Sequence, residues 1–249
     1  MDQVSSEGQS RIPSMDVHPV NHQAGGIKNE SLPFTVRLVR NAQDLHKAVS
    51  IRHSAYARHL PDFAESLRTP ETTDLKAGVA IFLAASKADG APLGTMRIQT
   101  NAYMPLALEH SLALPTYLRS GSLAEATRLG VTQEKIWRSV KTALFKSYYQ
   151  YCAQNTIQWM VIAGRSPLDR QYEKLMFKDV YPGGGYIPLH HANNVPHRVM
   201  TLEVAAVKSL WKAARHPLYA FFFETHHPDL ETDRDGSIAG GSRAPLALE

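Results

Sequence analysis

The chain has 249 residues, 43% of them hydrophobic and 20% charged, a composition typical of a soluble globular protein with one substantial core. One cysteine, Cys152, excludes an internal disulfide and a zinc module built from several cysteines, which fits a reducing compartment, and we expect a cytoplasmic protein. The net charge of +4 comes without a dense run of Lys and Arg, which argues against nucleic-acid binding, and no run of roughly 18 apolar residues predicts a membrane span.

Composition divides the chain into three regions. Residues 1–32 are rich in Ser, Gln, Asn, Gly and Pro without sustained periodicity, and ordering them would cost chain entropy while burying little surface. We therefore expect a flexible N-terminal arm, one folded α/β domain over residues 33–228, and a flexible C-terminal tail over residues 229–249.

The first elements of the domain follow from hydrophobic periodicity. Alternation and β-branched residues predict a strand over Phe34–Val39, after which Asn41 can cap a helix that reaches Tyr56. Two apolar runs, Val79–Ser86 and Leu93–Thr100, flank a turn and predict an antiparallel hairpin.

The second half of the domain is predicted to alternate between strands and helices. We expect strands over Ser122–Val131, Ile157–Ala163, Tyr186–Leu189 and Arg198–Val204. We expect helices over Gln133–Gln154, capped by Thr132, and over 167–177. An amphipathic stretch, 204–214, and an aromatic run, 218–223, follow and should pack on the core. Because a helix leaves the fourth strand and the fifth strand returns parallel to it, we expect the sheet to open between them and form a cleft.

The end of the fourth strand supplies the first candidate for chemistry. Strand alternation places Glu125 and Arg128 on opposite faces of the sheet unless a bulge intervenes. A strand glutamate in a cleft can take a proton from an incoming ammonium if burial raises its pKa. A structural salt bridge is the alternative interpretation of Glu125.

The segment that runs from Gln171 to Phe177 carries a family resemblance. It resembles the tyrosine-containing motif at the fourth helix of the general N-acetyltransferase (GNAT) enzymes, with Met176 where that family often has glycine. The resemblance implies the GNAT fold, a mixed central sheet splayed between its fourth and fifth strands and flanked by helices. It also implies that the hydroxyl of Tyr172 protonates the departing thiolate, whereas the residue pattern alone equally fits a core tyrosine.

The acyl donor is suggested by a missing loop. GNAT enzymes that use coenzyme A usually carry a glycine-rich loop whose amides bind the pyrophosphate, but the stretch 128–134 has one glycine and ends in an acid. We therefore expect a donor on the 4'-phosphopantetheine of acyl carrier protein, with no bound cofactor. We also expect no metal, because His190, His191 and His197 lack a carboxylate at diagnostic spacing.

Four short motifs resemble two groups of enzymes that use acyl carrier protein. The acyl-homoserine lactone synthases share Arg52-x-x-x-Tyr56, Glu71-x-x-Asp74, Gly94-Thr95-Met96-Arg97 and Glu125-Ala126-Thr127-Arg128. Those enzymes normally have a tryptophan where this chain reads Arg-His-Leu at 58–60. The C-terminal stretch 216–228 resembles the long-chain N-acyl amino acid synthases instead, and we favour this interpretation. The resemblance covers residues 34–228.

The resemblance implies a set of roles. Glu125 would accept or orient a proton, Arg97 and Arg128 would hold the carboxylate of an amino-acid acceptor, and backbone amides from Leu129 to Val131 would polarise the thioester carbonyl. Arg52 and Tyr56 are further expected substrate contacts, and Trp159 a wall of the acyl tunnel. For the arginines, a buried ion pair with Glu125 or Asp74 is the alternative.

A basic face is predicted on the long helix. Lys135, Arg138, Lys141 and Lys146 lie along much of one side and could steer the acidic carrier protein, or could simply be solvated.

Three other functions remain open on the sequence. One is an acyl-homoserine lactone synthase, which would need S-adenosylmethionine. The second is a coenzyme A-dependent N-acetyltransferase, and the third is a catalytically silent GNAT-like domain that binds a lipid or a regulator.

Overall fold

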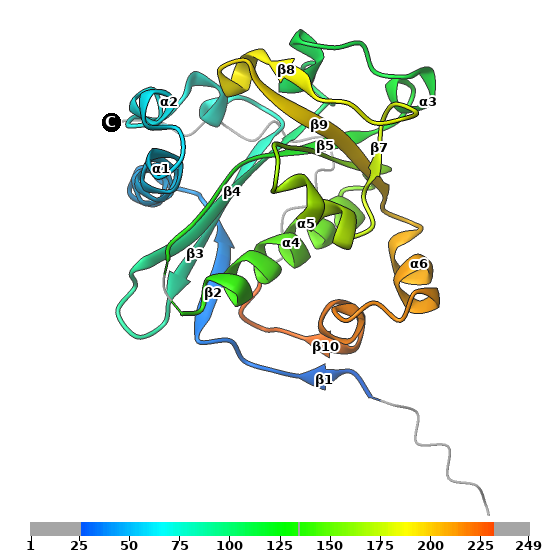
Figure 1. The fold of residues 1–249 in the computed structure, drawn as a ribbon. Coiled ribbons are helices and arrows are strands. Elements are labelled where there is room, and N and C mark those ends of the chain that lie inside the picture. Colours follow the sequence, from blue (N-terminus) through cyan, green and yellow to red (C-terminus); the bar gives the residue numbers. More distant parts are fainter. Residues whose placement is uncertain (1–25, 134, 232–249) are drawn as a thin grey trace, which may run out of the picture.

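The computed structural model describes residues 26–133 and 135–231, which form a mixed sheet flanked by helices (Figure 1). The strand order is β2-β3-β4-β5-β6-β9-β7, and β8 pairs with another part of β9. The strands are β2 (Phe34–Leu38), β3 (Val79–Ser86), β4 (Pro92–Thr100), β5 (Leu123–Val131), β6 (Trp159–Gly164), β7 (Lys178–Asp179), β8 (Ile187–Leu189) and β9 (Val195–Glu203). Neighbours pair antiparallel except β5 and β6, which are parallel.

The helices connect and cover these strands. They are α1 (Ala42–Ala57), α2 (Pro61–Glu65), α3 (Thr116–Arg119), α4 (Trp137–Gln154), α5 (Asp169–Lys174) and α6 (Val207–Ala213), with 3-10 turns η1 (Thr72–Leu75), η2 (Ala107–His110) and η3 (His190–Ala192) and a π-helical turn η4 (Ala220–Glu224). No helix in the described part of the chain is both long and apolar enough to cross a membrane.

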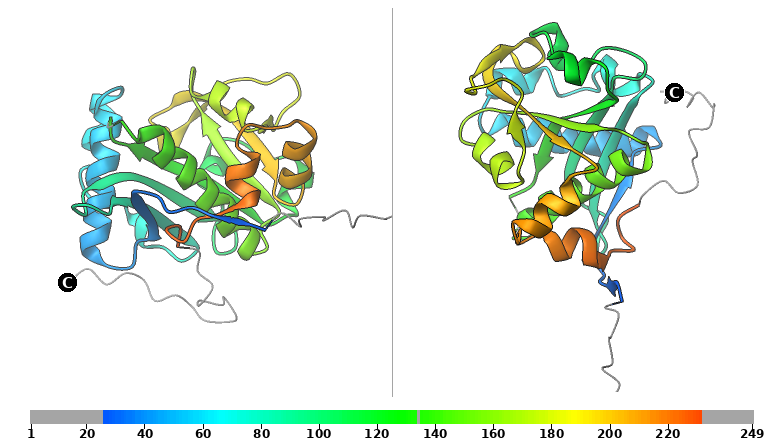
Figure 2. Two further views of the ribbon diagram at one scale, coloured as in Figure 1. Left: turned by 90° about the horizontal axis from the view of Figure 1, so that it is seen from below. Right: turned by 90° about the vertical axis from the view of Figure 1, so that its right-hand side faces the viewer.

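Strand alternation produces an apolar layer on each face of the sheet. In β3, Phe82 points into a core shared with Leu144 of α4, whereas its neighbour Leu83 packs with Leu45 and Val49 of α1. The sheet is therefore covered on both sides, and Figure 2 shows the same layers from two further directions.

The two large helices begin differently. The side chain of Asn41 accepts a hydrogen bond from the Asp44 N–H and caps α1, as predicted. In contrast, α4 begins at Trp137 rather than at residue 133. Thr132 does not cap it, because the residue before the first turn is Ile136, and the Thr132 N–H instead donates to the Leu93 carbonyl, 2.9 Å away, and continues the edge of β5.

The described chain is ordered beyond both expected domain boundaries. Lys28–Asn29 forms β1, which pairs in parallel with β10 (Thr225–His226), and Figure 1 shows the two side by side. Leu32 and Leu230 are both buried, and the Leu32 N–H donates to a carboxylate oxygen of Asp229, 2.7 Å away. Residues 26–32 and 229–231 therefore belong to the fold, whereas the rest of the predicted arm and tail lies outside the described residues.

The sheet opens where the sequence predicts. The parallel pairing of β5 with β6 ends at Ala126 and Ile162, although β5 stays paired with β4 as far as Val131. β5 also has one more residue than β4 in the interval that ends at Gly130, and Arg128 takes a positive φ of 53° there. This bulge overrides simple alternation and brings Arg128 to the face that carries Thr127.

Candidate active site

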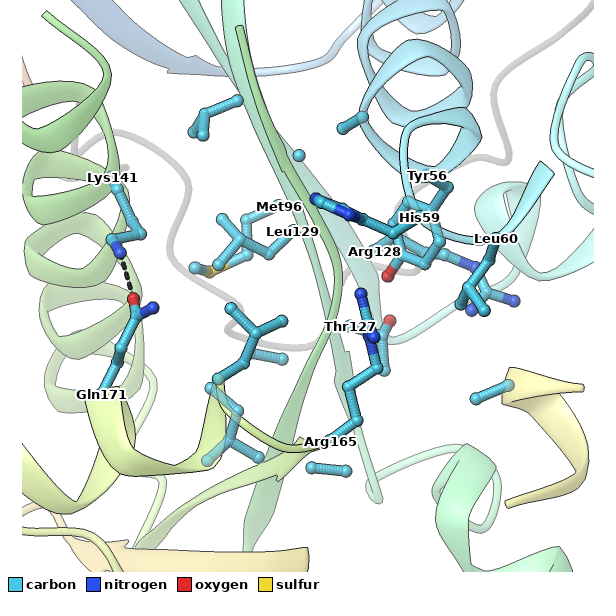
Figure 3. A pocket seen from close by; sticks show the side chains of 18 of the residues that line it. Tyr56, His59, Leu60, Met96, Thr127, Arg128, Leu129, Lys141, Arg165 and Gln171 are labelled. Atoms are coloured by element: carbon cyan, nitrogen blue, oxygen red, sulfur yellow. Dashed lines mark hydrogen bonds between the residues drawn. The ribbon is translucent and has the colours of Figure 1, made fainter. Parts of the chain in front are cut away.

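A cavity of about 690 Å³ occupies the opening between β5 and β6 (Figure 3). Tyr56 and Phe63 line it on the side of α1 and α2, and Trp137, Gln171 and Tyr172 line it on the side of α4 and α5. Its volume is in the usual range for pockets that bind small molecules. Its described lining contains four basic side chains and no carboxylate; the basic residues are Arg58, Arg128, Lys141 and Arg165.

Three predicted arginines meet two acids beside this cavity. The guanidinium groups of Arg52 and Arg97 both lie within 3.0 Å of oxygens of Glu71 and Asp74, and Arg128 donates two hydrogen bonds to Glu71, at 2.6 and 2.7 Å. Burial alone would raise the pKa of Glu71, but the hydrogen bond from Arg128 and the charges of Arg97, Arg128 and Arg52 lower it to about 2. Glu71 therefore stays ionised and pairs with all three cations, and Asp74 pairs with Arg52 and Arg97.

This cluster changes the expected roles of the arginines. Arg52 and Arg97 are almost fully buried and do not line the cavity, so the substrate contacts predicted for both are replaced by ion pairs with Glu71 and Asp74. Arg128 does line the cavity, although Glu71 and the His191 carbonyl already accept its hydrogen bonds.

Glu125 lies one layer behind the cavity wall. It is fully buried, one carboxylate oxygen accepts a 3.3 Å hydrogen bond from the Leu108 N–H, and the other lies 3.6 Å from Nε2 of His191. Burial raises the pKa of Glu125 to about 7, against the opposing effects of the Leu108 hydrogen bond and the nearby arginine charges. The carboxyl group can therefore take up and release a proton near neutral pH.

His191 stands between Glu125 and the cavity. Burial lowers its pKa to about 3, with the charges of Arg128 and Arg97 acting in the same direction, so the imidazole is neutral at pH 7. Its Nδ1 is buried without a hydrogen-bond partner in the described chain. From the sequence, His191 was considered only as a possible metal ligand, and no metal site was predicted. Its contact with Glu125 depends on η3, an element that the sequence pattern did not predict.

Tyr172 lines the cavity from α5. Its ring packs between Phe145 and Phe177, with ring centroids 5.9 and 6.4 Å away. Burial raises the pKa of Tyr172 well above its ordinary value, and the nearby Tyr56 hydroxyl adds to this effect. The Tyr172 hydroxyl therefore stays protonated and is available as a donor.

The edge of β5 supplies backbone groups to the cavity. Leu129 and Val131 line it, and β6 has already separated from this edge. The Thr132 N–H points to β4, so the N–H and the carbonyl of Val131 point away from β4. The Val131 carbonyl accepts a 2.9 Å hydrogen bond from Arg58. Amides on this edge can therefore reach a ligand.

The predicted basic face is divided in the structure. Lys135 and Arg138 are exposed, and Lys141 lines the cavity, where it lies over the Trp137 ring and donates to Gln171. The carrier-protein contact predicted for Lys146 is wrong, because this side chain is buried and cannot contact a partner.

Lys146 instead binds the C-terminal segment of the chain. Its Nζ lies 2.7 and 2.6 Å from the carbonyls of Phe221 and Thr225 and 2.8 Å from Nδ1 of His227. Trp159 is a second correction, because it packs edge-on against Tyr117, with ring centroids 5.6 Å apart, and does not line the cavity.

Comparisons with known proteins concern the fold. No family model and no curated protein matches the chain. A solved structure of FeeM, an N-acyl amino acid synthase from uncultured soil microbes, superposes with a TM-score of 0.55 at 16% identity, over 73% of this chain and 96% of that one.

Two other solved structures superpose less closely. One is an acetyltransferase assigned to the GNAT family from Desulfovibrio desulfuricans, with a TM-score of 0.49 at 15% identity, over 69% of this chain and 99% of that one. The other is Arabidopsis thaliana NAA60 in complex with acetyl-CoA, with a TM-score of 0.46, the same identity and the same coverage. The strand order, the opening between β5 and β6 and the superposition on FeeM agree: the chain has the GNAT fold.

Proposed function

We propose that this chain is an N-acyltransferase that moves a medium- or long-chain acyl group from the thioester of acyl carrier protein to the α-amine of an amino acid. The observation that carries this proposal is the cavity between β5 and β6, which reaches both sides of β5 and has cations but no carboxylate in its described lining. Such a cavity suits an anionic donor arm on one side of β5 and an acceptor on the other.

The two sides of the cavity differ in ways that suit these two substrates. The side formed by α4 and α5 is lined by apolar groups such as Met96 and Leu129, together with the half-buried Lys141, and suits an acyl thioester (Figure 3). The side formed by α1, α2 and η3 carries Tyr56, Arg128 and His191 and suits a small polar amine. The superposition on an N-acyl amino acid synthase is consistent with this assignment.

Transfer requires two protons to leave the acceptor nitrogen. The first leaves the ammonium through His191 and resides on Glu125, because the pKa of Glu125 is about 7 whereas that of His191 is about 3. The free amine then attacks the thioester carbonyl, the C–N bond forms and the C–S bond breaks. Tyr172 gives its hydroxyl proton to the departing thiolate and regains one from the second proton that leaves the nitrogen, so the tyrosine ends protonated and the carrier leaves as a free thiol. Backbone amides between Leu129 and Val131 stabilise the developing oxyanion.

Mass spectrometry of lipid extracts tests the proposal. Bacteria that express the chain should contain new N-acyl amino acids, and bacteria that express Glu125→Gln should not. The purified chain should also release free carrier thiol from acyl carrier protein when an amino acid is added, and should do so more slowly with acyl-coenzyme A. An active chain that prefers acyl-coenzyme A would replace the carrier-protein donor by coenzyme A, and a chain without any transfer would support a lipid-binding role.

Acyl-homoserine lactone synthesis is the second candidate. Arg52, Glu71, Asp74 and Arg97, which carry the resemblance to the lactone synthases, form one connected set of ion pairs beside the cavity. The same extracts distinguish the two functions, because a lactone synthase would produce acyl-homoserine lactones from S-adenosylmethionine and no linear N-acyl amino acid.

A further inference from the structure

Arg165 occupies a position in the cavity that the sequence did not single out. It directly follows β6, and its carbonyl accepts hydrogen bonds from the N–H groups of Leu168 and Asp169, at 2.7 and 3.2 Å. These bonds fix the backbone at the point where the chain turns into α5. Figure 3 shows the side chain extending from there into the cavity towards Thr127, on the same side of β5 as Tyr56.

The guanidinium group of Arg165 has no ion pair and no hydrogen bond within residues 26–133 and 135–231. In Arg128, by contrast, the same group is bound to Glu71 and to the His191 carbonyl. An arginine offers five N–H donors in a planar fork that matches a carboxylate, and a half-buried guanidinium without a partner is incompletely solvated. Arg165 is therefore the cavity cation best able to accept a new anionic partner.

The acids that could otherwise neutralise Arg165 are already engaged. Glu71 is shared by three arginines, and both Asp169 and Asp179 pair with Arg198. The cavity lining in the described chain adds no carboxylate of its own. Within residues 26–133 and 135–231, these pairs leave the guanidinium of Arg165 available to an anionic ligand.

The acceptor side of the cavity contains Arg165. Its charge lowers the pKa of His197, after the larger effect of burial, and His197 lines the cavity with His191. A ligand that is held by its anionic group at Arg165 can thus extend towards His191, where the proposed reaction removes the proton from the amine.

We propose that Arg165 binds the α-carboxylate of the acceptor and selects amino acids over amines that lack this group. The inference rests on the proposed acyltransferase function and moves the carboxylate site from Arg97 and Arg128, which are bound by Glu71, to Arg165. The ligand class is a small zwitterion whose carboxylate pairs with Arg165 and whose ammonium lies near His191.

Matched substrates test this assignment. Leucine is compared with isopentylamine, and phenylalanine with phenethylamine, in the wild-type chain, Arg165→Ala, Arg165→Lys and Arg170→Ala. Arg170 is an exposed arginine of α5 and serves as the control. We expect Arg165→Ala to raise the KM for both amino acids about 10- to 100-fold, the range for loss of a charge-assisted hydrogen-bonded pair, and to leave the KM for both amines unchanged. Arg165→Lys should restore part of the difference, and Arg170→Ala should resemble the wild type.

Several results would overturn the assignment. Equal effects of Arg165→Ala on amino acids and amines would refute it, and so would a raised KM for the acyl carrier protein alone, which would assign Arg165 to the phosphate of the donor. Because the guanidinium has no partner in the described chain, Arg165→Ala should unfold at the same temperature as the wild type.

Calorimetric titration with phenylalanine separates this inference from the proposed function. If the wild type transfers no acyl group but binds phenylalanine, and Arg165→Ala does not, the carboxylate site stands while the reaction is wrong. If phenylalanine binds both proteins equally or binds neither, the carboxylate site is wrong whatever the reaction.

Discussion

Replacing Glu125 by glutamine removes an ionisable group from the interior and nearly preserves its shape. In the folded chain the pKa of Glu125 is about 7, whereas the reference value, which describes the unfolded chain, is 4.5. Because the folded pKa is the higher one, the wild-type carboxyl contributes its full stability below about pH 4.5. It loses that contribution as the pH rises towards 7, since the unfolded chain ionises first.

The size of this effect follows from the two pKa values. Each pKa unit corresponds to about 1.4 kcal/mol, so the interval between 4.5 and about 7 amounts to about 3 kcal/mol once ionisation is complete. Glutamine cannot ionise, and the Leu108 N–H can still donate to its amide oxygen. The free energy of unfolding of Glu125→Gln minus that of the wild type should therefore grow by about 2 to 3 kcal/mol between pH 5 and pH 8.

Urea unfolding of the two proteins at pH 5, 6, 7 and 8, followed by circular dichroism, measures this difference. Glu203→Gln, at an exposed position of β9, is the control and should differ from the wild type by the same small amount at every pH. A difference for Glu125→Gln that stays constant or shrinks as the pH rises would refute the reasoning, because it would mean that the buried carboxyl does not resist ionisation.

Two further predictions concern the lysines and arginines of the α4 region. Lys146→Met should lower the free energy of unfolding by about 2 to 4 kcal/mol, because two carbonyls and His227 lose a charged donor. The same variant should leave the KM for the carrier protein unchanged. A raised KM without destabilisation would contradict the burial of Lys146. The double variant Lys135→Glu with Arg138→Glu should raise the KM for the carrier protein several-fold at low ionic strength and by less in 0.5 M salt, because both side chains are exposed and salt screens their charges. An unchanged KM would show that this surface does not attract the carrier protein.

Local sequence rules predicted most of the fold. Alternation located β2, β3, β4 and β5 because each strand has one face on α4 and another towards α1, and Asn41 caps α1 as its side chain allows. The order of elements predicted the opening after the fourth strand. The start of α4 and the short elements β1, β7 and β10 depend on hydrogen bonds to distant segments, which no local pattern encodes.

The candidate site could be predicted only in part. Glu125, Tyr172 and the acid–arginine pairs were named from short motifs, but the bulge that brings Arg128 to the face of Thr127 breaks the alternation on which the prediction depended. His191 reaches Glu125 across 66 positions of sequence, and Arg165 is distinguished only by the partners that it lacks in the described chain. Both properties belong to the tertiary structure.

The buried Lys146 also makes the attachment of the C-terminal segment measurable. An amine-reactive reagent such as acetic anhydride needs a lysine nitrogen with a free lone pair, and Nζ is enclosed by Phe221, Thr225 and His227. Acylation of Lys146 should therefore wait until that segment lifts, whereas the exposed Lys208 reacts at once. The ratio of the two labelling rates, read peptide by peptide, gives the free energy of this local opening separately from that of global unfolding.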